Sequence, residues 1–234
     1  MPVADRRTED GRLMGVVLLV RHGQASFGTD DYDVLSPTGW AQGRRLGRWL
    51  AGQGVVPTSL VRGDMRRHRE TLEAAAETAG WSLEATVDAD WDEFDHLGVV
   101  AGHSDVAASM GDRKAFQRVF EEATARWTAG EGTYDETWAG FVGRVRDALG
   151  RAVASAGPGC TVVVATSGGV IGVVAALLAD PDDDRPDALA RRWARANAVM
   201  VNSSVTRVVA GSTGPRLLSL NEHAHLDADL LTYR

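Results

Sequence analysis

The chain has 234 residues, a mass of 25.0 kDa and a formal net charge of −7. With 44% hydrophobic and 24% charged residues, it is typical of a folded globular protein, which excludes wholesale disorder and collagen-like structure. A single cysteine, Cys160, excludes an internal disulfide, and the acidic balance disfavours nonspecific binding to DNA, although a local basic patch stays open.

Residues 1–15 lack the long apolar core of a signal peptide, so we expect a cytoplasmic protein that begins with a short polar tail. An apolar run at Val16–Val20 then predicts a buried parallel strand. Ser36 and Pro37 are typical of the start of a helix. The first half of the chain continues with a predicted strand, helix and strand at Thr58–Val61, Arg66–Ala79 and Ser82–Val87.

Residues 88–133 differ from the rest of the chain, because acidic, glycine and aromatic residues are frequent there. Only one helix is clear in this region, near Ser104–Trp127. We interpret residues 88–133 as a helical insertion that covers one end of a single domain comprising residues 1–234.

Helices and strands alternate again in the second half. The predicted elements are a helix at Asp135–Ala154, a strand at Thr161–Ala165, helices at Gly169–Leu178 and Ala188–Arg195, and strands near Val199–Val209 and Arg216–Ser219. This alternation predicts a three-layer α/β/α sandwich with a mostly parallel central sheet. Residues 152–179 carry no charge and are long enough to span a bilayer, but glycine-rich turns interrupt them, so we expect no membrane contact.

Two predicted strands end in residues that suit a phosphate group. Arg21 and His22 directly follow the first strand, and Ser167 and Gly168 join the later strand to its helix. Ligands of such sheets bind beyond the carboxyl ends of the strands, and free N–H groups at a helix start attract anions. Arg67 lies near the start of another helix and adds a second guanidinium.

The ordered set of motifs resembles the histidine phosphatase superfamily, also called phosphoglycerate mutase-like. The matching segments are Arg21-His22-Gly23, DYDVLSPTGWAQGRRLG, MRRHRET, WDEF and DETWAGFVGRVRDAL, within a resemblance that runs from about residue 16 to 225. The resemblance implies a phosphoglycerate mutase-like fold and a phosphomonoesterase that needs no metal or other cofactor. It implies a phosphohistidine intermediate on His22.

The same resemblance gives roles to further residues. Arg21 and Arg67 would bind the phosphoryl group, and Glu93 would be the general acid, with Asp92, Asp95 and Glu84 as alternatives. Gln24 is expected at the pocket rim as a further phosphate contact, beside the backbone of Gly168.

One position departs from the family pattern. The family carries a second pocket histidine in a "SHGG" turn, whereas this chain has Ser167 in its place. Ser167 is interpreted either as a phosphate ligand or as a turn residue. His223 and His225 are expected in a surface tail, with a metal pair or entry of one of them into the pocket as alternatives. His68 is expected on the surface of its helix.

We therefore expect a hydrolase for a small-molecule phosphate ester, with no nucleic-acid or membrane partner. A homodimer and the identity of the substrate stay open. The alternatives are a catalytically weakened phosphate-binding or regulatory module, suggested by Ser167, and a mutase of the same family, disfavoured because no "RHYG"-like segment is present.

Overall fold

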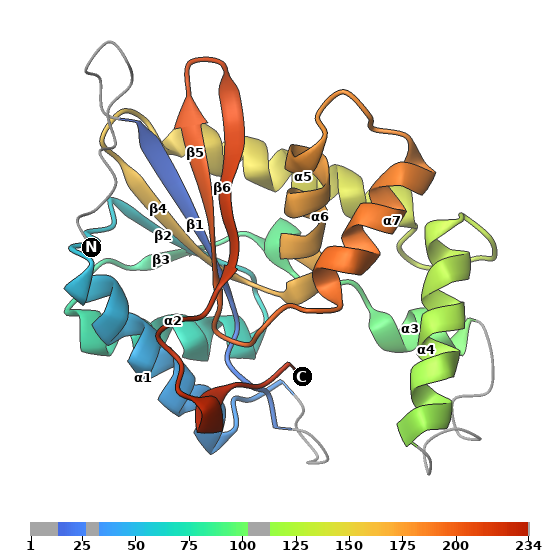
Figure 1. The fold of residues 1–234 in the computed structure, drawn as a ribbon, viewed down its shortest axis with the longest axis horizontal. Helices are drawn as coiled ribbons and strands as arrows, with labels where there is room; N and C mark the ends of the chain where they lie inside the picture. Colours follow the sequence, from blue (N-terminus) through green and yellow to red (C-terminus); the bar gives the residue numbers. More distant parts are fainter. Residues whose placement is uncertain (1–13, 27–32, 103–112, 234) are drawn as a thin grey trace.

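The computed structural model describes residues 14–26, 33–102 and 113–233. Its centre is a six-stranded sheet in the order β3-β2-β4-β1-β5-β6 (Figure 1). The strands are β1 (Gly15–Arg21), β2 (Ser59–Arg62), β3 (Ala85–Val87), β4 (Thr161–Thr166), β5 (Val205–Gly211) and β6 (Gly214–Glu222). Strands β1 to β4 run parallel, β5 pairs antiparallel with β1, and β6 pairs antiparallel with β5, which confirms the expected mostly parallel sheet.

Helices cover both faces of the sheet, as Figure 1 shows. On one side lie α1 (Pro37–Gly52) and α2 (Arg66–Ala79), and on the other α5 (Trp138–Ser155), α6 (Gly168–Ala179) and α7 (Pro186–Asn197). The N-cap Ser36 accepts a hydrogen bond from the N–H of Gly39, as its position before Pro37 predicts.

Strand β1 explains why two layers of helices form. Its successive side chains point to opposite faces. Val16, Leu18 and Val20 pack in the core beneath α1 and α2, whereas Val17 and Leu19 join the core beneath the other helices. Because the residues on both faces of β1 are apolar, the strand is buried on both sides.

The segment expected as an insertion contains η1 (Ala89–Trp91), α3 (His96–Ala101) and α4 (Arg113–Thr128). The helix expected near Ser104–Trp127 is therefore observed from Arg113, and residues 103–112 lie outside the described residues. Trp91 and Phe94 fill the core, and Phe94 stacks on Trp127 with ring centroids 4.7 Å apart. No helix in the described ranges could cross a membrane.

The last strand pair differs from the expectation in one respect. The sequence predicts a strand from about residue 199, but β5 begins at Val205. Residues 202–204 instead form a turn in which Ser203 has a φ of 62°. This turn supports the end of β1, as the next section describes.

The sheet order creates a switch point between β1 and β4. The chain leaves β1 for α1 and then β2 on one side, and leaves β4 for α6, α7 and then β5 on the other. Arg21 pairs in register with Thr166, so the carboxyl ends of both strands meet there. This is the place where open α/β sheets bind ligands.

Candidate active site

His22 is held by its backbone at the end of β1. Its N–H donates to the carbonyl oxygen of Thr166 at 2.8 Å. Its carbonyl oxygen accepts from the N–H of Ser203 and from Nδ2 of Asn202, both at 3.2 Å. The turn at residues 202–204 therefore fixes the position of the histidine.

One hydrogen bond fixes the tautomer of the His22 side chain. Its Nδ1 lies 2.7 Å from the carbonyl oxygen of Gly23. A carbonyl can only accept, so Nδ1 carries the proton and Nε2 keeps its lone pair. Burial and the charges of Arg67 and Arg21 hold the pKa of His22 well below its ordinary value of 6.5. The imidazole is therefore neutral at pH 7.

The charges of both expected arginines lower the pKa of His22. Both guanidinium groups therefore lie near its ring. Arg67, buried in the first turn of α2, donates from Nη1 to Asp33 Oδ1 at 2.7 Å. Arg21 donates from Nη1 to the carbonyl oxygens of Met200 and Tyr233. The two guanidiniums concentrate positive charge around His22, as an anionic phosphoryl group requires.

Thr71 joins the first strand end to α2. Its hydroxyl donates to the carbonyl oxygen of Arg67 at 2.7 Å, and its Oγ1 accepts from the N–H of Gly23 at 2.9 Å. One threonine thus fixes the distance between the His22 turn and the Arg67 turn.

Glu93 is the acid that the structure brings to the site. Its Oε2 accepts from the N–H of Gly169 at 2.9 Å. Burial raises the pKa of its carboxyl above the ordinary value, against the opposing pull of the Gly169 N–H and of Arg67 and Arg21. A Cβ on Gly169 would lie 2.2 Å from Glu93 Oε1, so only glycine leaves room for this carboxyl.

The three alternative acids have other surroundings. Asp92 Oδ1 accepts from the N–H groups of Asp64 and Met65. Asp95 caps α3 by accepting from the N–H groups of Leu97 and Gly98. Glu84 is exposed and directly precedes β3, so it lies at the amino ends of the parallel strands, opposite the carboxyl ends where His22 lies.

Ser167 lies at the N-terminus of α6, fully buried, and its Oγ is 2.7 Å from Nε2 of His68. The expectation that His68 lies on the helix surface is wrong, because His68 is fully buried. Its ring centroid is 5.8 Å from that of His22. The spacing i, i+4, i+7 of His68, Leu72 and Ala75 is the sequence signal that indicates its inward position.

Of the two further expected phosphate contacts, Gln24 has a side-chain partner within the protein. Gln24 Oε1 accepts from the hydroxyl of Ser36, which couples the loop after His22 to the start of α1. Gly168 begins α6, and a Cβ on it would lie 3.3 Å from Arg21 Nε. The N–H of the next residue, Gly169, is bonded to Glu93, so this helix start serves the acid.

His225 is buried rather than in a surface tail, which corrects that expectation. It stacks on Trp49 with ring centroids 5.0 Å apart, and its Nε2 lies 3.1 Å from the carbonyl oxygen of Ser203. It thus supports the turn that holds His22. His223 Nδ1 lies 2.6 Å from the carbonyl oxygen of Asn221. Within the described ranges, no three His, Cys, Asp or Glu residues form a metal-binding group.

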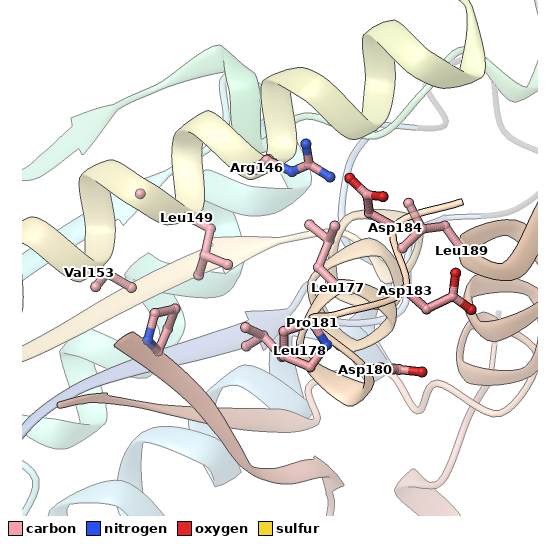
Figure 2. Close-up of a pocket in the computed structure, with 12 residues that line it drawn as sticks. Arg146, Leu149, Val153, Leu177, Leu178, Asp180, Pro181, Asp183, Asp184 and Leu189 are labelled. Carbon is pink, nitrogen blue, oxygen red and sulfur yellow. The ribbon is translucent and has the colours of Figure 1, made fainter. Parts of the chain in front are cut away.

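A separate groove of about 380 Å³ lies at the far end of α6, beside Leu177 and Leu178 (Figure 2). Helix α6 has 12 residues, so this groove lies roughly 15 Å along the helix from its start at Gly168. Arg146 and Asp184 are among its lining residues, and none of the expected site residues lines it.

Comparisons with known proteins find solved structures that share this fold. Among solved structures, a mycobacterial hydrolase is 24% identical, with a TM-score of 0.62 over 93% of this chain and 94% of its own. A mycobacterial glucosyl-3-phosphoglycerate phosphatase is 22% identical, with a TM-score of 0.59 over 90% of this chain and 100% of its own. A phosphoserine phosphatase from Entamoeba histolytica, solved with phosphoserine, is 16% identical, with a TM-score of 0.62 over 91% and 99%.

No curated protein matches the chain significantly. The model of the histidine phosphatase superfamily (branch 1), however, matches residues 17–223. The matched region includes both strand ends, Arg67 and Glu93. The chain therefore belongs to the histidine phosphatase superfamily.

Proposed function

We propose that this protein hydrolyses phosphate monoesters of small molecules without a metal, through a phosphohistidine on His22. The observation that carries the proposal is the tautomer of His22: Nδ1 is bonded to the carbonyl oxygen of Gly23, so Nε2 keeps a free lone pair. Similar folds whose names specify phosphatases for glucosyl-3-phosphoglycerate and phosphoserine support a phosphatase activity.

In the first step, Nε2 of His22 forms a bond to phosphorus while the bond from phosphorus to the ester oxygen breaks. Arg21 and Arg67 balance the charge on the phosphoryl oxygens. The leaving alkoxide needs a proton, and Glu93 is suited to supply it because burial raises its pKa.

In the second step, a water molecule attacks the phosphohistidine. Glu93, now a carboxylate, accepts a proton from that water, the bond from nitrogen to phosphorus breaks, and neutral His22 and inorganic phosphate result. Each proton that Glu93 gives in the first step is thus recovered in the second.

The test is a screen of sugar phosphates, nucleotides and phosphoamino acids in the presence of a chelator, with wild type and His22→Ala. We expect turnover by wild type and a loss of several orders of magnitude in the variant, because the covalent route loses its nucleophile. Labelled substrate should leave acid-labile phosphate on wild type only. His223→Ala, outside the site, is the matched control and should retain both properties.

Ser167 favours a second candidate, a phosphate-binding module with weakened catalysis, because the family histidine is missing from this turn. Turnover in His22→Ala equal to that of wild type would contradict the phosphohistidine route. Phosphate binding by wild type without turnover of any substrate would favour the module.

A further inference from the structure

A chain of three polar side chains runs beside His22. His68 Nε2 lies 2.7 Å from Ser167 Oγ, and His68 Nδ1 lies 3.4 Å from Asp92 Oδ1. The three residues come from α2, from the end of β4 and from the segment after η1. The fold, rather than a local motif, therefore brings them together.

Ser167 is not used as serines at its position ordinarily are. A serine at the N-cap usually accepts a hydrogen bond from an N–H of its own helix. The side chain of Ser167 makes no such bond and faces His68 instead. On the side of His68 that faces Asp92, a Cβ on Gly63 would lie 2.4 Å from both Asp92 Oδ1 and His68 Nδ1. The contact between Asp92 and His68 is therefore closely packed.

The hydrogen atoms in this chain can be assigned from the partners of Asp92. Burial opposes its ionisation, but its contact with His68 and the N–H groups of Met65 and Asp64 outweigh burial and lower its pKa. Asp92 is thus a carboxylate that only accepts, and Nδ1 of His68 carries the proton that faces it.

The direction of the second contact then depends on the charge of His68. When His68 is neutral, its Nε2 has a lone pair, so the Ser167 hydroxyl donates to it and turns only oxygen lone pairs toward an anion. When His68 is charged, Nε2–H donates to Ser167 Oγ, and the hydroxyl hydrogen is released for a phosphoryl oxygen.

The surroundings of His68 act in opposite directions, and their net effect lowers its pKa, so the imidazole of the free protein is neutral. Burial and Arg67 favour the neutral imidazole, whereas Asp92 and Asp33 favour the charged one. His22, whose pKa is lowered by His68 among others, is neutral. A bound phosphoryl dianion adds negative charge to this balance and shifts it toward the imidazolium.

We propose that His68 takes up a proton from solvent when a phosphoryl dianion binds, and thereby turns Ser167 into a hydrogen-bond donor to that anion. His68 is then a positioning residue, and the pair supplies from α2 the charge that the histidine of the "SHGG" turn would supply from α6. This inference rests on the proposed phosphate-ester site.

The first test follows the six histidines of the protein by NMR after ¹⁵N labelling, with sulfate as a dianion that exchanges no proton near neutral pH. Saturating sulfate should raise the titration midpoint of His68 by about one pH unit or more. His223 in the same spectra should shift far less. An unchanged midpoint of His68 would overturn the proposal.

The second test separates proton uptake from folding. Ser167→Ala and Asp92→Asn should each weaken sulfate binding by about tenfold or more. The first variant loses the hydroxyl donor, and the second loses the carboxylate that stabilises charged His68. Ser167→Thr, which keeps the hydroxyl, should restore most of the affinity. Equal affinities of wild type and Ser167→Ala would count against the proposal.

The third test exchanges the two positions. Ser167→His alone should lower turnover, because the new imidazole meets His68. Together with His68→Ala it should recover, because one histidine again occupies the space. A gain in turnover from Ser167→His alone would show that His68 does not fill this place.

These outcomes are distinct from those of the proposed function. Sulfate should raise the midpoint of His68 in His22→Ala as well, since no turnover is involved. If sulfate leaves the titration midpoint of His68 unchanged while turnover depends on His22, only the proposed proton uptake by His68 is wrong. If the midpoint of His68 rises in a protein without turnover, the proposed function is wrong, and the proton uptake by His68 belongs to a phosphate-binding module.

Discussion

Two turns meet at the carboxyl edge of the sheet, and they are built differently. Both follow buried apolar strands, β1 and β4, that pair in register. The turn after β1 contains its functional side chains within its own sequence, since Arg21 and His22 are consecutive. The turn after β4 contains a hydroxyl group and glycines, and its ionisable partners, His68 and Glu93, lie far away in the sequence.

This difference predicts which part of the site tolerates substitution. In the proposed mechanism, Arg21 and His22 of the first turn act directly on the phosphoryl group, so we expect that no neighbour can replace them. In the second turn, Gly169 provides space and an N–H for Glu93, and Ser167 depends on His68 for its hydrogen-bond direction. The second turn can therefore be altered and repaired by changes elsewhere.

The largest effect, after loss of His22 itself, is expected from the charge around the first turn. Arg67→Gln should lower kcat/KM by about 10²- to 10³-fold, because the phosphoryl charge loses a preorganised partner. Arg67 lowers the pKa of both His22 and Glu93. Activity needs neutral His22 and protonated Glu93, so both limbs of the pH profile should move to higher pH in the variant.

A pH profile of kcat/KM measures this shift. Arg69→Gln, two residues further along α2 and exposed, is the matched control. A fall in kcat/KM with unmoved limbs would contradict the electrostatic role and indicate a structural one.

The second turn should respond to a single methyl group. In Gly169→Ala, the new Cβ would meet the Glu93 carboxyl at 2.2 Å and displace it. We expect turnover of alkyl phosphates to fall by about 10²-fold, and that of aryl phosphates far less, because aryl leaving groups need little protonation. Glu93→Gln should give the same selective loss.

The control for this prediction is Gly143→Ala in α5, where a Cβ would meet nothing within 4 Å. Its activity should match that of wild type. Equal slowing of alkyl and aryl esters in both Gly169→Ala and Glu93→Gln would exclude Glu93 as the general acid.

The two turns also differ in how far sequence alone predicts them. The β1 turn was expected in full, because an apolar run followed by Arg21 and His22 is a contiguous pattern. The contacts of His68 with Ser167 and Asp92 were missed, because no spacing in the sequence connects these three residues. His68 itself was predictable, since its spacing from Leu72 and Ala75 is that of an inward helix face.

The sheet and most helices were predictable for a similar physical reason. Caps, breakers and apolar periodicity are local, as Ser36 before α1 and Gly80 after α2 illustrate. The late start of β5 was not, because the turn at residues 202–204 is stabilised by contacts with the end of β1, such as that between Asn202 and His22. Long-range contacts there outweigh the local preference for a strand.

The smallest effect is expected outside both turns, at His225, which should act on stability rather than on turnover at neutral pH. Burial lowers its pKa from 6.5 to about 4. Its stabilising effect is therefore complete above about pH 6.5 and is lost as the pH falls toward about 4, because the unfolded chain then binds a proton that the folded protein excludes. Between about pH 7.5 and about pH 5, this linkage should cost roughly 2 kcal/mol of the free energy of unfolding.

Urea unfolding of wild type and of His225→Gln at the two pH values measures this effect. The loss of unfolding free energy between the two pH values should be smaller in His225→Gln than in wild type by roughly 2 kcal/mol, whatever the absolute stability of the variant. His223→Gln, two residues earlier, should keep the pH dependence of wild type. The same pH dependence in His225→Gln as in wild type would mean that His225 is already charged in the folded protein, and that the contact with Ser203 does not require a neutral ring.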